Sequence, residues 1–346
     1  MMNFRLLLLS LIFLLLFACG GKSKLDIDVS DVKIDLEIKR FDQELLGADL
    51  YDLRNLNTNW QKDYGLLYHS FLSQMLQVGY PNDNMITLQL EKYLADTTTQ
   101  QITQEINLVF NDFAPFATEL KDAFTRYKYY FPDSVIPKIV TFHSNFNAKA
   151  FPEKHQLGIG LDLFLGKESE ITKALPQDVF PSYIQENMDK EYLVSNVMKH
   201  WLYFKFSEPK DFNNNGIYIK KDDFLNTIIH HGKILYLLDA MLPNKSIENK
   251  LELTKSQLEW CEKSEKFLYQ TLIEKKLIYT KNYKEISRFI NPGPFTNGFP
   301  ENSPSGVGKW IGYQMVKQYM EGNDISIAEL VSRTNDSRRI LSYYRI

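Results

Sequence analysis

The sequence predicts an α+β protein that is predominantly α-helical and carries a small β-sheet. Apolar residues recur at spacings of three and four through most of the second half of the 346-residue chain, which is typical of amphipathic helices. Two short apolar segments, residues 137–142 and 156–166, are β-branched or punctuated by glycine, which is typical of strands. A third segment, residues 32–38, alternates apolar and charged residues with the period of a half-buried strand.

Residues 1–18 have the pattern of a lipoprotein signal peptide. Arg5 supplies the positive start, and residues 6–17 form an uncharged apolar run that is too short to span a bilayer. The run closes on Leu16-Phe17-Ala18-Cys19, which resembles the bacterial lipobox. The resemblance implies cleavage before Cys19 and acylation of its thiol. We therefore expect an exported protein held on a membrane by lipid, with residues 19–30 as the lipidated tether.

Charge and cysteine content narrow the range of functions. Removing residues 1–18 removes Arg5 alone, which leaves 39 basic and 43 acidic residues and a net charge of −4. This balance gives no electrostatic footprint for nucleic acid, so no nucleic-acid partner is expected and membrane attachment depends on the acyl chains. Once Cys19 is acylated only Cys261 remains, which excludes an intramolecular disulfide and a cysteine-based metal site. Cys261 is expected to be a buried helix residue.

Residues 31–346 are expected to form a single, mainly helical globular domain, because no linker divides them. One helix is expected over much of residues 60–76, where Trp60, Tyr64 and Leu67 share an apolar face. A second is expected over residues 99–127, with an interruption at Pro115. The other predicted helices cover residues 190–206, 222–241, 254–274, 307–320 and 325–333.

One helix places a histidine where a zinc hydrolase would carry its metal-binding motif, His-Glu-x-x-His. His200 stands at the first ligand position, Trp201 at the position of the base, and Phe204 at the position of the second ligand. Tryptophan cannot take a proton from a metal-bound water, and phenylalanine cannot bind a metal. The motif therefore fails twice, and we interpret His200 as a satisfied or exposed helix histidine.

A second histidine cluster, His230-His231-Gly232-Lys233, lies in the next predicted helix. Adjacent helical side chains point about 100° apart, so the two imidazoles cannot easily bind one ion. His231 and Lys233 could line a pocket, but a solvated face or partner surface is favoured. Nucleotide-binding fingerprints are missing, and no spacing of carboxylates indicates an acid–base pair, so no cofactor is expected.

Several segments together resemble the GldB family of gliding-motility lipoproteins of Bacteroidetes. The resemblance extends over essentially the whole chain and agrees with the lipobox. It implies an envelope lipoprotein that cells need in order to glide over surfaces, with other gliding or secretion proteins as partners, and it brings no catalytic residues with it. The segments that carry it are Ile38–Asp42, Leu157–Gly166, His231–Tyr236, Pro243, Trp260-Cys261, Asn291–Thr296, Ser303-Pro304 and Gly308–Gln314.

A more distant similarity concerns predicted zinc peptidases of the zincin type. The order of a glycine-rich strand, a helix with His200, a helix with His231-Gly232 and a helix with Gly312 is similar to theirs, which implies a zincin-like scaffold. In those proteins an acidic metal ligand precedes the glycine, whereas here the position holds His231. The metal motif is therefore degenerate, although the packing of the scaffold does not depend on it.

These observations favour a membrane-anchored envelope lipoprotein of gliding motility that faces the periplasm and acts as a non-catalytic interaction or scaffold component, not an enzyme. The glycine-rich strand is expected to line a partner groove and to accept a peptide by edge pairing. The alternative is a divergent zinc-dependent peptidase that uses His200, His231 and one carboxylate. A lipid or glycan carrier is a third hypothesis, which predicts a large apolar cavity. The residues assigned to the groove are His200, Trp201, Phe204, His231, Lys233 and Tyr236.

Overall fold

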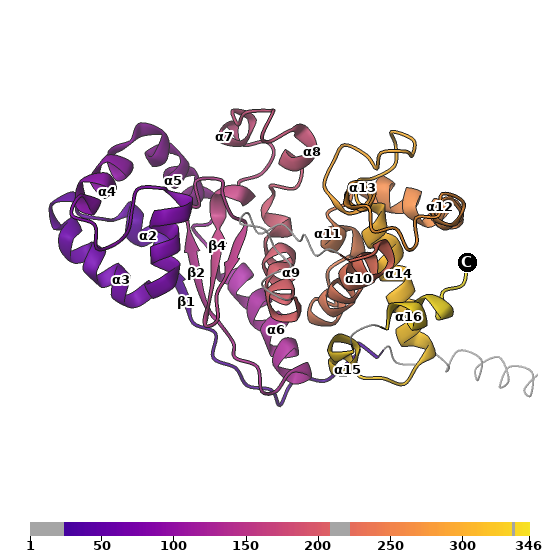
Figure 1. Ribbon diagram of the computed structural model, residues 1–346. Coiled ribbons are helices and arrows are strands. Elements are labelled where there is room, and N and C mark those ends of the chain that lie inside the picture. The colour runs from indigo at the N-terminus through magenta and orange to yellow at the C-terminus, as the bar shows by residue number, and fades with distance from the viewer. Residues whose placement is uncertain (1–23, 208–221, 334–335) are drawn as a thin grey trace, which may run out of the picture.

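A four-stranded sheet lies between two groups of helices (Figure 1). The computed structural model describes residues 24–207, 222–333 and 336–346. The strands are β1 (Ile38–Arg40), β2 (Lys138–Phe142), β3 (Ala150–Pro152) and β4 (Gln156–Gly160), in the order β1-β2-β4-β3. β1, β2 and β4 run parallel, whereas β3 pairs antiparallel with β4. The predicted class, mainly helical with a small sheet, is confirmed.

Strand β2 divides its side chains between two apolar clusters. Because successive residues of a strand point to opposite faces, Ile139 packs into the larger cluster while Val140 and Phe142 pack into the smaller one. All three side chains are fully buried. Both faces of the sheet are therefore covered, which explains the continuous apolar character of this segment.

The smaller cluster, at the left of Figure 1, is built around an aromatic core. The ring centroid of Phe41 lies 4.7 Å from that of Tyr64, 5.3 Å from that of Phe71 and 5.4 Å from that of Trp60. Edge-to-face and tilted arrangements at these distances are favourable for aromatic pairs. The helices that supply this cluster are α2 (Phe41–Leu46), α3 (Leu53–Ser70) and α4 (Ile86–Ala95). α5 (Thr97–Val109) lies next to α4 in Figure 1, but its Ile102 and Ile106 belong to the larger cluster.

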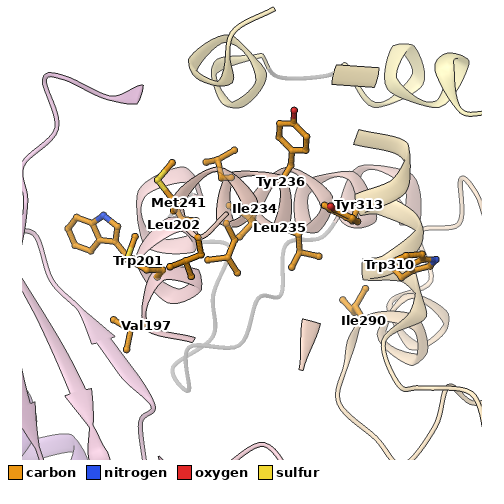
Figure 2. Packing of buried hydrophobic residues seen from close by; sticks show 14 of the residues in the cluster. Val197, Trp201, Leu202, Ile234, Leu235, Tyr236, Met241, Ile290, Trp310 and Tyr313 are labelled. Atoms are coloured by element: carbon orange, nitrogen blue, oxygen red, sulfur yellow. The ribbon is translucent and has the colours of Figure 1, made fainter. Parts of the chain in front are cut away.

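The larger cluster fills the other side of the sheet and contains a close helix crossing. There α10 meets α14 through glycine, since a Cβ on Gly232 would lie 2.2 Å from the carbonyl oxygen of Gly312. Figure 2 shows part of the apolar packing around α10. The helices of this side are α6 (Ala114–Tyr130), α7 (Glu170–Lys173), α8 (Ser182–Gln185), α9 (Leu193–Phe206), α10 (Phe224–Met241), α11 (Ile247–Leu251), α12 (Lys255–Glu274), α13 (Tyr283–Ile290), α14 (Val307–Gly322), α15 (Ile327–Ser332) and α16 (Ser337–Tyr343).

The helix predictions hold with small shifts at the ends. The interruption expected at Pro115 is the break between α5 and α6, and Pro115 occupies the first turn of α6, where proline is tolerated. The strand predicted over residues 32–38 is wrong in length, because strand pairing begins only at Ile38, although the apolar side chains before it are the more buried ones as expected. The strand predicted over residues 156–166 is also too long, since a 3₁₀ helix, Leu161–Phe164, follows Gly160.

The sheet order corrects the hypothesis of edge pairing on the glycine-rich strand. β4 lies between β2 and β3, so both of its hydrogen-bonding edges are occupied. Gly160 is small for a packing reason: a Cβ there would lie 2.0 Å from the carbonyl oxygen of Ala148 and 2.7 Å from the Cβ of Ser144. The glycine permits the approach of the loop that precedes β3.

Replacing Gly160 with alanine is therefore expected to destabilise the fold, whatever the protein binds. The clash falls on a loop that can shift, so we expect the free energy of unfolding to drop by about 2 kcal/mol. Urea denaturation measures the change. Gly47→Ala is the control, because its Cβ would meet no atom closer than 3.4 Å. Equal stability of the two variants would contradict the packing explanation.

Candidate functional site

His200 lies on α9 and bonds within its own helix. Its Nδ1 forms a hydrogen bond of 2.8 Å with the carbonyl oxygen of Asn196, one turn earlier. Burial lowers the pKa of His200 to about 4, and the neighbouring ammonium group of Lys199 also lowers it. The imidazole is thus neutral and hydrogen-bonded at pH 7.

Trp201 and Phe204, at the two positions that would carry zinc chemistry, have other contacts. Trp201 is fully buried, and its ring packs edge-on against Phe124 at 5.9 Å and Tyr127 at 6.2 Å, both on α6. Phe204 is 38% exposed and its ring lies 5.8 Å from that of Trp201. Trp201 is therefore a core residue that fixes α9 on α6, and Phe204 covers its outer side.

His231 joins α10 to α9. Its Nδ1 is hydrogen-bonded with the hydroxyl of Tyr203, and the two rings lie 5.6 Å apart. Burial holds the pKa of His231 well below its usual value, with Lys309, His230 and Lys199 adding repulsion. The expectation of a solvated face at this position is wrong, because His231 is only 5% exposed.

Lys233 and Tyr236 make contacts that do not involve His200. The ammonium group of Lys233 is buried and donates to Asp336 Oδ1 at 2.8 Å and to the carbonyl oxygen of Arg333 at 2.9 Å, so it attaches the C-terminal residues to α10. Tyr236 is also buried, and Figure 2 shows its ring and that of Trp201 projecting in different directions. The six residues predicted to line one groove are therefore distributed over several contacts.

The strongest electrostatic feature of the region is a group of charged residues that the sequence did not single out. The carboxylate of Glu252 accepts from Lys199 Nζ at 2.7 Å and from Lys149 Nζ at 3.0 Å. Burial by itself would raise the pKa of Glu252, but the two ammonium groups hold it well below its usual value. Lys149 also donates to the carbonyl oxygen of Asn187 at 3.1 Å. We call Lys149, Lys199, Glu252 and Lys309 the lysine cluster.

Lys309 of α14 is the fourth member. Burial and repulsion from Lys199 together lower its pKa to about 8, against the attraction of Glu252. Lys309 forms no hydrogen bond or ion pair through its side chain with any residue that the structure describes. The cluster thus carries three ammonium groups around one carboxylate, next to the neutral imidazoles of His200 and His231.

This arrangement joins helices and offers positive charge, but it does not form an acid–base pair. A carboxylate held by two ammonium groups is a poor proton acceptor at neutral pH. Across the described ranges, no group of three or more His, Cys, Asp or Glu side chains could hold a metal ion. Cys261 is buried as expected, and burial raises the pKa of its thiol to about 12. Cys19 lies outside the described residues.

A pocket between α6 and the end of α10 bears on the carrier hypothesis. Its volume is about 290 Å³, and charged side chains contribute to its lining: Glu119, Asp122, Arg126 and Lys245. Lys245 and Glu119 form an ion pair of 3.2 Å there. A lining of this kind does not suit an acyl chain.

Stability is expected to fall as the pH is lowered from 7 towards 4. The pKa values of His143, His200 and His231 are all lowered, chiefly by burial. Between the folded and unfolded pKa values the unfolded chain binds more protons, so the free energy of unfolding rises with pH. Each of these histidines contributes up to about 1.4 kcal/mol per pH unit below pH 6.5.

Denaturation in urea at several pH values tests this dependence. His200→Gln should flatten the slope by up to one proton between pH 6 and pH 4.5, whereas His155→Gln, at an exposed turn position, should not change it. A slope that is the same in the wild type and His200→Gln would contradict the assignment of a neutral buried imidazole.

Of the comparisons with known proteins, the one with family models found a match. The family model described as gliding motility protein GldB matches residues 22–345, nearly the whole chain. No curated protein and no solved structure matches significantly, and the zincin similarity is not shown. Within the described residues, no helix combines the length and the apolar character that crossing a membrane requires. Since the match covers almost every residue of the sheet, the helices and the lysine cluster, the chain belongs to the GldB family of gliding motility proteins.

Proposed function

We propose that this protein is a lipid-anchored envelope component of the gliding machinery, that it faces the periplasm, and that it acts by contact with other envelope proteins without catalysing a reaction. Acylation of Cys19 supplies the anchor, and residues 19–30 supply the tether, of which Lys24 and Leu25 already contact the body. Residues 31–346 form one globular domain in this proposal, because β2 contributes side chains to both apolar clusters.

The non-catalytic role is supported by the contacts that the residues around His200 make. Trp201 packs in the core against α6, and His231 is neutral and hydrogen-bonded with Tyr203. Each residue that would perform zinc chemistry therefore has a packing or hydrogen-bonding role instead. The lysine cluster places positive charge beside these residues, which suits recognition of a partner's carboxylate or another anionic group.

Complementation of a gliding bacterium that lacks its own copy tests the proposal. Cys19→Ser should release the protein from the membrane fraction and abolish spreading of colonies. His200→Gln should preserve gliding, because the imidazole performs no reaction in this account. His155→Gln is the matched control for a change of histidine at an exposed position.

The competing peptidase hypothesis makes the opposite prediction. It requires stoichiometric zinc in the purified protein, and it requires His200→Gln to lose zinc and gliding together while the protein remains folded by circular dichroism. That combination would reverse the assignment. Normal gliding of Cys19→Ser would remove the anchor from the account.

A further inference from the structure

The contacts of the first described residues limit how the protein can be oriented on a membrane. Lys24 donates from Nζ to the carbonyl oxygen of Asn323, and its ammonium group lies 3.7 Å from Asp324 Oδ1. Leu25 packs against the larger apolar cluster. Figure 1 shows the first described residues beside α15, on the same side as α16 and the C-terminus. The tether therefore leaves the body at the turn between α14 and α15.

The remaining tether is short compared with the body. Cys19 precedes Lys24 by five residues, which span at most about 18 Å when fully extended. A globular domain of this length has a radius of gyration of about 20 Å and is hence about 50 Å wide. A body that is wider than its tether cannot turn freely above the membrane, so the surface next to Lys24 must stay close to the lipid headgroups.

The chemistry of that surface suits headgroups. Arg338, Arg339 and Arg345 are exposed, and none of them forms an ion pair with a carboxylate of the described residues. Arg339 lies 5.9 Å from the ring centroid of Tyr319, whose carbonyl oxygen accepts from Asn323 Nδ2 at 2.8 Å, so Arg339 adjoins the exit of the tether. Arg338 lies on the same helix, 5.4 Å from the ring centroid of Tyr279.

Arginine places an apolar stem and a charged tip at a membrane interface. The exposed acidic groups near this surface include Asp26 and Asp28, which follow Lys24, and Glu321. Asp324 lies 3.7 Å from the ammonium group of Lys24, and Glu329 pairs with Arg333 at 3.4 Å.

We propose that the α14–α15 turn and α16, residues 323–326 and 337–346, form a membrane-facing surface that lies against the phospholipid headgroups of the membrane in which Cys19 is anchored. The helices α2 to α5, across the sheet in Figure 1, then point away from the membrane. The inference rests on the lipid anchor of the proposed function and adds the orientation of the body.

Site-directed spin labelling of the acylated, signal-processed protein tests the orientation. The protein is reconstituted in vesicles of phosphatidylethanolamine and phosphatidylglycerol that contain a small fraction of lipid with a nickel-chelating headgroup. Cys261 is buried and does not compete for the label, so Ser342→Cys on α16 and Leu108→Cys on α5 each provide one exposed site. Nickel in the headgroup layer should relax the label at residue 342 strongly and the label at residue 108 no more than in buffer.

Two further variants separate the effect of the short tether from the effect of the arginines. A flexible Gly-Ser insertion of 30 residues after Gly21 should abolish the difference between the two sites, because it removes the limit on reach. Replacing Arg338, Arg339 and Arg345 with glutamine should reduce relaxation at residue 342 without releasing the protein. Equal relaxation at both sites in the unmodified protein, or stronger relaxation at residue 108, would overturn the orientation. Failure of the protein to float with the vesicles would overturn the anchor itself, and the orientation with it.

Discussion

Replacing Gly312 with alanine is expected to lower the free energy of unfolding by about 3 kcal/mol or more. A Cβ at this position would lie 1.9 Å from the carbonyl oxygen of Ile228 and 2.5 Å from its carbonyl carbon. Both atoms belong to the backbone of α10, so no side-chain rotation can relieve the clash. Alanine favours a helix over glycine by about 1 kcal/mol, which does not offset a separation of the two helices.

Urea denaturation of Gly312→Ala and Gly322→Ala measures this effect within a single helix. A Cβ on Gly322 would lie 3.1 Å from Cδ1 of Tyr343, an atom that can move. Gly322→Ala should therefore change the stability by less than about 1 kcal/mol. A Gly312→Ala protein as stable as Gly322→Ala would mean that α10 and α14 do not meet through glycine.

The crossing also gives a physical reason for two segments that carry the family resemblance. Gly232 and Gly312 belong to His231–Tyr236 and Gly308–Gln314, and each glycine faces the backbone of the other helix. Close packing at this point requires the absence of a side chain, which a search for catalytic residues does not consider. Helix packing therefore explains the two glycines of these segments.

Periodicity predicted α12 because it buries one apolar stripe, and α10 was predicted by its length and its apolar character, since it is buried on nearly all sides. Periodicity did not find β3, which has only three residues and is held by its pairing with β4. The strand over residues 32–38 was predicted too long because its hydrogen-bonding partner, β2, lies about a hundred residues later in the chain and pairs only with Ile38–Arg40. Pairing at such a separation leaves no local signal in the sequence.

At the candidate site, the sequence likewise did not predict which charged residues come together. His200 and His231 were found because a motif search looks for histidine, but Lys149, Glu252 and Lys309 come from three separate segments. A lysine on a helix is usually solvated, so its pattern predicts a surface. Burial of such lysines depends on partners that only the fold brings close to them.

Replacing Asp162 with alanine is expected to be the most damaging single change, with a loss of about 4 kcal/mol in the free energy of unfolding. The carboxylate is fully buried and accepts from the backbone N–H of Ser144 at 2.8 Å, the hydroxyl of Ser144 at 2.9 Å and the backbone N–H of Phe146 at 2.5 Å. Each buried donor left without an acceptor costs about 1–3 kcal/mol.

Asp162 also holds an unfavourable backbone in place. Asn145 and Phe146 both have positive φ, 54° and 58°, which is uncommon for asparagine and rare for a bulky residue. The loop turns there between β2 and β3 and brings Ser144 against Gly160. Without the carboxylate, the bonds that offset about 1 kcal/mol of conformational strain at Phe146 are lost, so the loop is expected to relax out of this conformation.

A series of three variants distinguishes these contributions. Ser144→Ala removes only the hydroxyl bond and should cost about 1 kcal/mol, because both backbone bonds remain. Asp162→Asn keeps an oxygen but loses the negative charge, and it should cost about 2 kcal/mol. Hydrogen exchange of the peptide that contains residues 143–147 should accelerate in the same order, with Asp162→Ala fastest. If Ser144→Ala destabilised the protein as much as Asp162→Ala, the hydroxyl and not the two backbone bonds would hold this loop.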